Sequence, residues 1–167
     1  MRSTLLLLLA LIASPWAQAE LIDEVNDRGE LRIAVQADTP PFSFKENDRL
    51  TGFAIELGQV LADELDVRAE FIETPADEVV PGVESGKYDI ALDQVNATEQ
   101  LDGRVDVSQP YQTPEDGKPS LVIPFQKGNP AFRSAVDNAL QRIKDDGRLT
   151  ALQQKWLEKQ DNAPAQP

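Results

Sequence analysis

Residues 31–65, LRIAVQADTPPFSFKENDRLTGFAIELGQVLADEL, decide the fold. The first five, residues 31–35, alternate apolar with less apolar side chains, which predicts a β-strand. Across residues 53–65 the apolar side chains recur at helical spacing with polar ones opposite them, which predicts an amphipathic helix. A proline pair and a polar turn separate the two elements. A strand followed closely by a helix is the repeating unit of an α/β protein.

Strand-like segments recur along the rest of the chain. They are predicted over residues 67–72, 88–92, 105–107 and 121–125. Because these strands alternate with helical segments, we expect an α/β fold whose mainly parallel sheet is covered by helices on both faces. Ligands of such sheets bind beyond the carboxyl ends of the strands. The loops at those ends are residues 36–42, 73–76 and 93–98.

Three further helices are predicted. One opens with Thr74 as its N-cap, Pro75 at the first helical position and an acid in the first turn, and Pro81 should kink or shorten it. Another opens at Asn129-Pro130, presents one apolar stripe and ends at Gly147. A last amphipathic helix carries Leu149, Leu152 and Trp156, with Trp156 expected in the core.

The composition excludes several classes of protein. The chain has no Cys and no His, and 16 Lys and Arg stand against 29 Asp and Glu, for a net charge of −13. Nucleic-acid binding needs a basic face, so none is expected. The usual metal ligands, the usual neutral-pH general base and any thiolate nucleophile are missing, and no acidic run has the spacing of a calcium loop. We therefore expect no metal and no cofactor.

The two ends of the chain are predicted to lie outside the folded domain. Residues 1–19 combine Arg2, a short apolar run and a closing Ala-Gln-Ala, which is typical of a cleaved signal peptide; an N-terminal anchor is the alternative. The run is shorter than the about 20 residues of a membrane span. Residues 160–167 are expected to be a disordered tail. The remainder, residues 20–159, is expected to be one folded domain, with no membrane insertion after signal cleavage.

Five segments in order resemble the family 3 extracytoplasmic solute-binding proteins of amino-acid ABC importers. They are LRIAVQADTPPFSF (31–44), LTGFAIELGQVLADEL (50–65), VESGKYDIAL (83–92), VDVSQPY (105–111) and KGNPAFRSAVDNALQRIKDDGRLTALQQKWL (127–157). The resemblance implies a periplasmic-binding-protein (type II) fold, in which two lobes close on the ligand. Here a turn-rich connector, residues 112–120, stands where the second lobe would be inserted, so we expect a single three-layer lobe.

The positions that touch ligand in the family differ in this chain. Where the resemblance expects an acid and a stacking aromatic, the chain has Gln36 and Thr39, with Asp38 close by. Where it expects a serine-glycine pair, a threonine and an arginine that clamps the ligand's α-carboxylate, the chain has Asp93, Gln94, Asn96 and Leu101. Arg104 could replace that arginine only if the loop were rebuilt. Binding of free α-amino acids in the family's manner is therefore doubtful.

Side chains at the carboxyl edge of the sheet are the candidate ligand-binding residues. The set is Gln36, Asp38, Thr39, Phe42, Asp93, Gln94, Asn96 and Thr98. The seven polar residues predict a polar, cation-tolerant rim, and Phe42 an aromatic wall. Two alternatives stay open: a solvated surface left by the missing lobe, and, for the phenylalanines, simple core packing. Tyr111 is expected at the lost hinge, covering an edge or offering a partner contact.

Three functions follow from these observations. The first is a non-enzymatic periplasmic domain of a Gram-negative bacterium that binds a small polar solute, amino-acid-like or cationic, weakly or together with an ABC permease or a sensor. The second is a degenerate lobe that acts as a protein-interaction or self-association module without a small ligand. The third, an enzyme using Asp38 and Asp93 as an acid/base pair, has no supporting motif.

Overall fold

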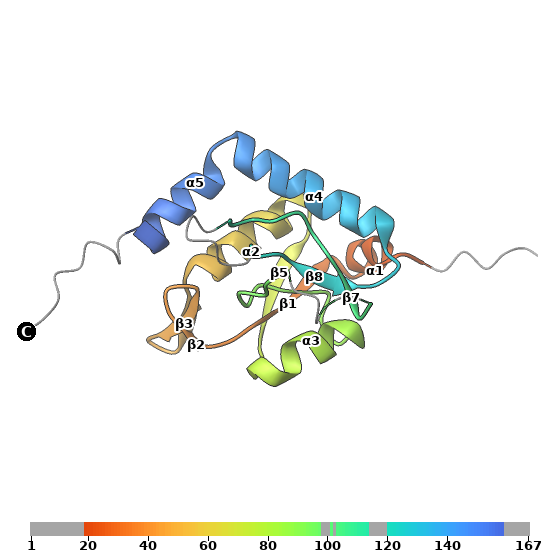
Figure 1. Ribbon diagram of the computed structural model, residues 1–167, viewed down its shortest axis with the longest axis horizontal. Coiled ribbons are helices and arrows are strands. Elements are labelled where there is room, and N and C mark those ends of the chain that lie inside the picture. Colours follow the sequence, from red (N-terminus) through yellow and green to blue (C-terminus); the bar gives the residue numbers. More distant parts are fainter. Residues whose placement is uncertain (1–18, 98–100, 102, 114–119, 159–167) are drawn as a thin grey trace, which may run out of the picture.

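The computed structural model describes residues 19–97, 101, 103–113 and 120–158. Residues 1–18 of the predicted signal peptide, the predicted tail and residues 114–119 of the predicted connector lie outside these ranges. Within them the chain forms one α/β lobe, as the alternation of strands and helices predicted (Figure 1).

The main sheet has five strands in the order β5-β1-β6-β8-β7. Their bounds are β1 Glu30–Val35, β5 Arg68–Glu73, β6 Ile90–Ala91, β7 Val105–Val107 and β8 Pro124–Gln126. Strand β1 pairs in parallel with β5 and with β6, whereas β8 is antiparallel to β6 and β7. The parallel pairings include the longest one, β1 with β5, and confirm the predicted mainly parallel sheet. None of the described residues between β7 and β8 is helical, and a connection without a crossover helix suits an antiparallel pair.

A second, small sheet follows β1 directly. It consists of β2 (Asp38–Thr39), β3 (Ser43–Glu46) and β4 (Arg49–Thr51), all antiparallel. The turn between β3 and β4 places Asn47 and Asp48 at φ of 50° and 60°, which is the backbone of a two-residue hairpin turn that favours Asn and Asp. The polar turn predicted from residues 46–48 is confirmed.

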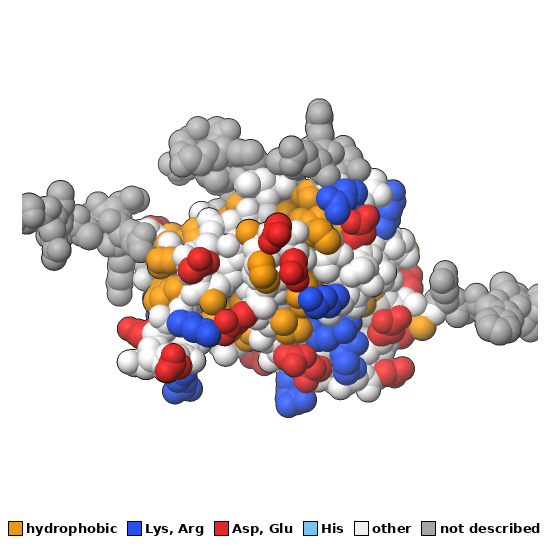
Figure 2. Space-filling model, turned by 90° about the horizontal axis from the view of Figure 1, so that it is seen from below, with side chains coloured by type: hydrophobic (Ala, Val, Ile, Leu, Met, Phe, Trp, Pro, Cys, Tyr) orange, Lys and Arg blue, Asp and Glu red, His pale blue; other side chains and the backbone are white. Residues whose placement is uncertain are grey.

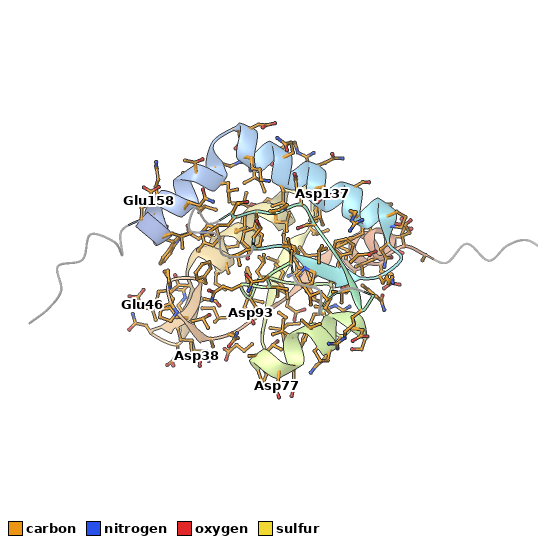
Figure 3. The ribbon with its side chains drawn as sticks, viewed as in Figure 1. Asp38, Glu46, Asp77, Asp93, Asp137 and Glu158 are labelled. Carbon is orange, nitrogen blue, oxygen red and sulfur yellow. The ribbon has the colours of Figure 1, made fainter. Side chains whose placement is uncertain are left out.

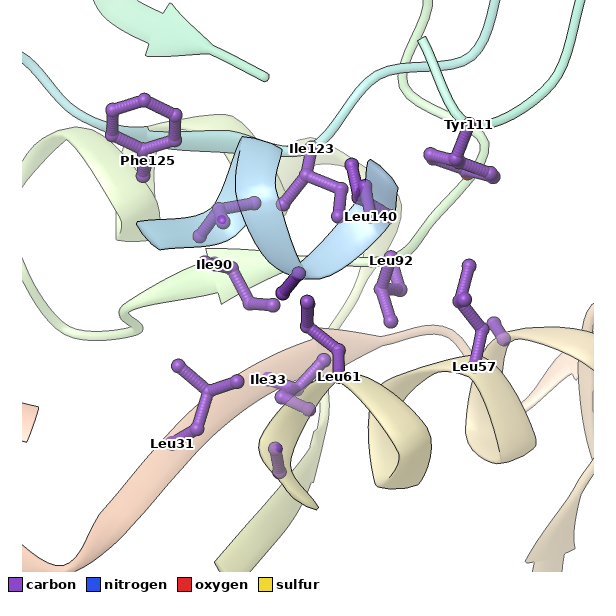
Figure 4. Close-up of a cluster of buried hydrophobic side chains, with 14 of the residues drawn as sticks. Leu31, Ile33, Leu57, Leu61, Ile90, Leu92, Tyr111, Ile123, Phe125 and Leu140 are labelled. Atoms are coloured by element: carbon purple, nitrogen blue, oxygen red, sulfur yellow. The ribbon is translucent and has the colours of Figure 1, made fainter. Parts of the chain in front are cut away.

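Helices cover both faces of the main sheet (Figure 1). On one face lie α1 (Leu21–Arg28), α2 (Phe53–Glu64), α4 (Pro130–Asp145) and α5 (Arg148–Gln153), and α3 (Ala76–Glu84) covers the other. A single π-helical turn, Gln154–Glu158, continues α5. Figure 4 shows Leu57 and Leu61 of α2 in the same buried cluster as Ile33 of β1. Burial of these side chains drives the helices onto the sheet.

Helix α3 begins one residue later than predicted and is not shortened at Pro81. Pro75, and not Thr74, is its N-cap, and it has no side-chain capping bond. The hydroxyl of Thr74 donates instead to the carbonyl of Ile72 at 2.9 Å. The helix also continues through Pro81 to Glu84. A proline at the sixth position removes one backbone donor while the packing of Val79 and Val83 on the sheet holds the helix.

Three other features differ from what the sequence suggested. Asn129 is the N-cap residue of α4, as predicted, but its side chain makes no capping bond within that helix. Trp156 is only partly buried: its ring packs edge-on against Phe44, with centroids 6.1 Å apart. Helix α1 was not predicted from the sequence at all. It buries only Leu21 and Val25, too short an apolar pattern to stand out from its charged surroundings.

Candidate functional site

Two adjoining hollows lie where the three predicted loops come together, at the carboxyl ends of β1, β5 and β6. The Asp93 hollow, about 360 Å³ in volume, is lined by Gln36, Ala76, Val79, Val80, Asp93, Gln94, Val95, Asn96 and Leu101. The Asp38 hollow, about 520 Å³, is lined by Gln36, Ala37, Asp38, Glu73, Thr74, Pro75 and Ala76. Gln36 and Ala76 belong to both walls, so the hollows share a boundary.

The register of the parallel strands brings Gln36 and Asp93 together. Ala34 of β1 pairs with Ala91 of β6, and the two polar residues follow at the same distance along each strand. The side-chain amide Nε2 of Gln36 donates to Oδ2 of Asp93 at 2.7 Å. The other carboxylate oxygen, Oδ1, is buried and has no hydrogen-bond partner in the described part of the chain. A carboxylate can accept about four hydrogen bonds, so most of its capacity is unused.

The environment of Asp93 disfavours its negative charge. Burial raises the pKa of the Asp93 carboxyl, the hydrogen bond from Gln36 partly opposes this, and the negative charge of Asp38 adds to the rise. A partly buried carboxylate without a counter-ion costs free energy. A positive charge bound next to Asp93 would therefore lower the free energy of the site.

Cationic side chains near the two hollows are already paired with acidic residues. Lys45 forms an ion pair with Glu73 at 2.7 Å. Arg104 pairs with Glu84, at the far end of α3, at 2.7 Å, and it lines neither hollow. Most Lys and Arg side chains on the face in Figure 2 lie on its right half, the side on which α1 and the amino ends of the strands lie in Figure 1.

The structure brings most of the eight predicted residues to this edge of the sheet. Gln36, Asp93, Gln94 and Asn96 line the Asp93 hollow. Asp38 lies across Gln36 in the other hollow, and Figure 3 shows Asp38 and Asp93 on different elements of the same side of the lobe.

The other three predicted residues do not line either hollow in the described structure. The hydroxyl of Thr39 contacts Ser43, with its carbonyl 3.1 Å and its hydroxyl 3.0 Å away, inside the small sheet. Phe42 packs edge-on against the buried ring of Phe53, with centroids 5.8 Å apart, as the core-packing alternative expected. Thr98 lies outside the described residues.

Several lining residues were missed. Glu73 ends β5 and stands at the start of the predicted loop 73–76, so its position directly after a strand was the available signal. Val79 and Val80 come from α3, which the sequence presented only as a helix with a buried face. Leu101, 8% exposed, lines the Asp93 hollow. This is the position at which the resemblance places the carboxylate-clamping arginine.

Tyr111 does not offer the partner contact that the sequence suggested. It is 3% exposed, and its ring stacks on Phe53 with centroids 6.3 Å apart. Burial raises the pKa of its hydroxyl, and the charge of Asp93 raises it further. Tyr111 is therefore a core residue beneath the site.

The described residues contain no group of three acidic side chains placed to hold a metal ion. The search for membrane spans, made over the same residues, finds no helix long and apolar enough to cross a bilayer.

A single α/β lobe with polar hollows at the carboxyl edge of its sheet is the architecture of a solute-binding domain. The chain belongs to the bacterial extracellular solute-binding proteins, family 3, whose family model matches residues 31–159.

Named relatives agree with this assignment. The L-cystine-binding protein TcyJ of Escherichia coli (strain K12) is 32% identical over 143 residues, which are 85% of this chain and 52% of the relative. The chain thus spans about half the length of that curated relative, and the relative's name is that of a binding protein.

Solved structures show the same fold. The arginine-bound form of domain 1 from TmArgBP superposes with a TM-score of 0.68 at 27% identity, covering 72% of this chain and 98% of that domain. The ancestral amino acid-binding protein AncCDT-1, a precursor of cyclohexadienyl dehydratase, has a TM-score of 0.76 at 24% identity, covering 83% of this chain and 99% of that one. At that identity the second likeness concerns the fold alone.

Proposed function

We propose that this chain is a non-enzymatic, one-lobed receptor domain that binds the positively charged group of a small, amino-acid-like or cationic solute. The observation that carries the proposal is the partly buried Asp93 carboxylate, which accepts one hydrogen bond from Gln36 and lines a hollow whose described lining residues include no Lys or Arg. The role we assign to it is presentation of the solute to an ABC permease or a sensor, in the periplasm, after cleavage of the leader at residues 1–19.

An ammonium or guanidinium group would relieve the cost of the Asp93 charge. It would pair with the exposed side of the carboxylate and supply donors to acceptor sites that Gln36 leaves free. A single lobe buries one side of a small ligand, so affinity is expected to be weak unless a partner closes the site. Support for one-lobe binding comes from domain 1 of TmArgBP, whose structure holds arginine.

Asp38 and Asp93 line different hollows, with Gln36 between them. A pair separated in this way does not converge on one reacting atom, which argues against the acid/base alternative. The interaction-module alternative stays a prediction, and the experiment below distinguishes it from solute binding.

The test is a thermal-shift and calorimetric titration of the protein, expressed from its full sequence, with arginine, lysine, cadaverine, glutamate and succinate. A cation at a hundred times its dissociation constant adds about 2.7 kcal/mol, which raises the unfolding midpoint by roughly 5–15 °C. We expect such shifts with the three cations and none with the two net-negative acids, glutamate and succinate. Asp93→Asn should abolish them, whereas Asp63→Asn, an exposed change on α2, should not.

A cooperatively folded protein that responds to none of these cations would overturn the proposal. A defined dimer in light scattering of that same protein would then favour the interaction module.

A further inference from the structure

We infer that the solute is a dication without a carboxylate, such as a diamine or a guanidino-amine, and that it spans the two hollows across Gln36. This inference rests on the proposed function and narrows its ligand class. It follows from the charges that face the site, from the residue that replaces the expected carboxylate clamp, and from the shared wall between the hollows.

Among the described residues that line the Asp93 hollow, none would hold a carboxylate. Asp93 is the one charged residue among them. Leu101 occupies the wall where the resemblance places an arginine, and an aliphatic side chain neither donates a hydrogen bond nor carries charge. Arg104 is held by Glu84 through both Nε, at 3.1 Å, and NH2, at 2.7 Å. An α-carboxylate in this hollow would face Asp93 without a partner, and such like-charge contacts are unfavourable.

The Asp38 hollow offers a second negative charge. Its two charged lining residues are Asp38 and Glu73. Lys45 neutralises Glu73 through their ion pair, whereas Asp38 is exposed and makes no ion pair with any described residue. A second cationic group of the solute would therefore pair with the carboxylate of Asp38.

Gln36 connects the two positions. Its side chain belongs to both walls, and its Nε2 is committed to Asp93. The remaining oxygen of this amide is an acceptor, so it suits the N–H groups of a passing cation. Because Gln36 and Ala76 line both hollows, an aliphatic linker between the two cationic groups would lie over these two residues.

Matched pairs of an amino acid and its decarboxylated amine test the inference directly. Dissociation constants are measured by calorimetry for lysine against cadaverine and for arginine against agmatine, which differ only in the carboxylate. We expect each amine to bind at least about tenfold more tightly than its amino acid, equivalent to about 1.4 kcal/mol. Equal or tighter binding of the amino acids overturns the inference while leaving the proposed function standing. Binding of none of these four compounds overturns the proposed function.

Two variants locate the groups involved. In the natural chain we expect cadaverine to bind more tightly than pentylamine, which has a single amine. Asp38→Asn should remove this difference in affinity, whereas Glu46→Gln, an exposed change in the same small sheet, should leave it unchanged. Leu101→Arg should reverse the preference toward the amino acids. Since Leu101 is buried, its variant is scored only when it unfolds cooperatively, and the exposed Asp38 variant decides the question without it. An unchanged cadaverine advantage in Asp38→Asn contradicts the two-hollow arrangement.

Discussion

Glu20 and Asn129 cap each other's helices. Asn129, which precedes α4, accepts a hydrogen bond at its Oδ1 from the backbone N–H of Leu21, the first residue of α1, at 2.8 Å. Glu20, which precedes α1, accepts at its carboxylate from the backbone N–H groups of Ala131 and Phe132 in α4, at 2.7 and 3.3 Å. Because first-turn N–H groups have no partner within their own helix, the exchange ties the start of the chain to its C-terminal part.

Removal of one of these caps should weaken the whole lobe. Asn129→Ala leaves the buried N–H of Leu21 without an acceptor and removes the bond from Asn129 to the carbonyl of Gln126. We expect a loss of about 1–2 kcal/mol in the free energy of unfolding, measured by urea denaturation. Ser134→Ala, an exposed change on the same helix, should stay within about 0.5 kcal/mol. Equal effects of the two changes would contradict the capping role.

Asp93→Asn should stabilise the ligand-free protein at neutral pH. Burial raises the pKa of Asp93, so its contribution to stability is present below the ordinary pKa of aspartate and is lost as the pH rises through the raised value. Asparagine keeps an oxygen for the Gln36 bond and carries no charge. Thermal unfolding at pH 7 should therefore give a higher midpoint for the variant than for the natural chain.

The same comparison at pH 3 is the control, because both side chains are then neutral and the midpoints should coincide. Asp63→Asn, exposed on α2, should show neither effect. A lower midpoint for Asp93→Asn at pH 7 would contradict the unpaired-charge interpretation.

Asp89 should be the most sensitive acidic residue for folding. Its side chain is fully buried at the opposite end of β6 and accepts from the side chains of Arg28 and Arg32 and from the backbone N–H of Arg32. The bond to Asp89 raises the pKa of Arg32, and burial partly opposes the rise. Asp89→Ala leaves these donors unpaired, and we expect a loss of about 3 kcal/mol in urea denaturation.

The matched control is Glu78→Ala. Glu78 and Lys87 form an ion pair whose side chains are 57% and 59% exposed, so its removal should cost less than about 1 kcal/mol. Comparable losses for Asp89→Ala and Glu78→Ala would show that burial is not what makes Asp89 important.

Alanine substitutions at two glycines distinguish the energetic cost of backbone strain from that of a steric clash. Gly52, before α2, has φ of 121°, and a Cβ there would lie 2.4 Å from the carbonyl oxygen of Phe42. Gly128 has φ of 84° with nothing within 4 Å of such a Cβ. Gly128→Ala should cost about 1–2 kcal/mol from its left-handed backbone alone. Gly52→Ala should cost clearly more, and calorimetric unfolding compares the two. Equal losses would mean that the loop at Phe42 moves freely aside.

Much of the fold could be predicted because its strongest signals are local. The alternation in residues 31–35 and the apolar stripes of α2 and α4 correctly placed a strand and two helices. Apolar side chains recur with the period of a helix or a strand when one face of that element packs on the core. The period can therefore be recognised in the sequence without knowledge of which elements pack against it. The order of strands and helices then predicted which loops share the carboxyl edge, and residues of all three loops line the two hollows.

Local pattern failed where a distant residue decides the structure. Helix α1 has only two buried residues. The backbone N–H of its first residue, Leu21, donates to Oδ1 of Asn129, which lies 108 positions further along the chain. Thr74 has a side chain typical of an N-cap, yet its hydroxyl donates a hydrogen bond to the carbonyl of Ile72 instead of capping the helix. Phe42 suited a ligand wall by type and position, but the hydrophobic contact with Phe53 turned it toward the core.

By itself the sequence determined the class of fold, the edge of the sheet that carries the polar groups, and the absence of His and Cys chemistry. Only the tertiary structure decided that Gln36 holds one oxygen of Asp93, that the other oxygen is buried without a partner among the described residues, and that Leu101 faces the same hollow. The physical reason is that residue types and periodicity are properties of the chain. Burial, pairing and the pKa of a carboxylate are set by side chains that only folding brings together.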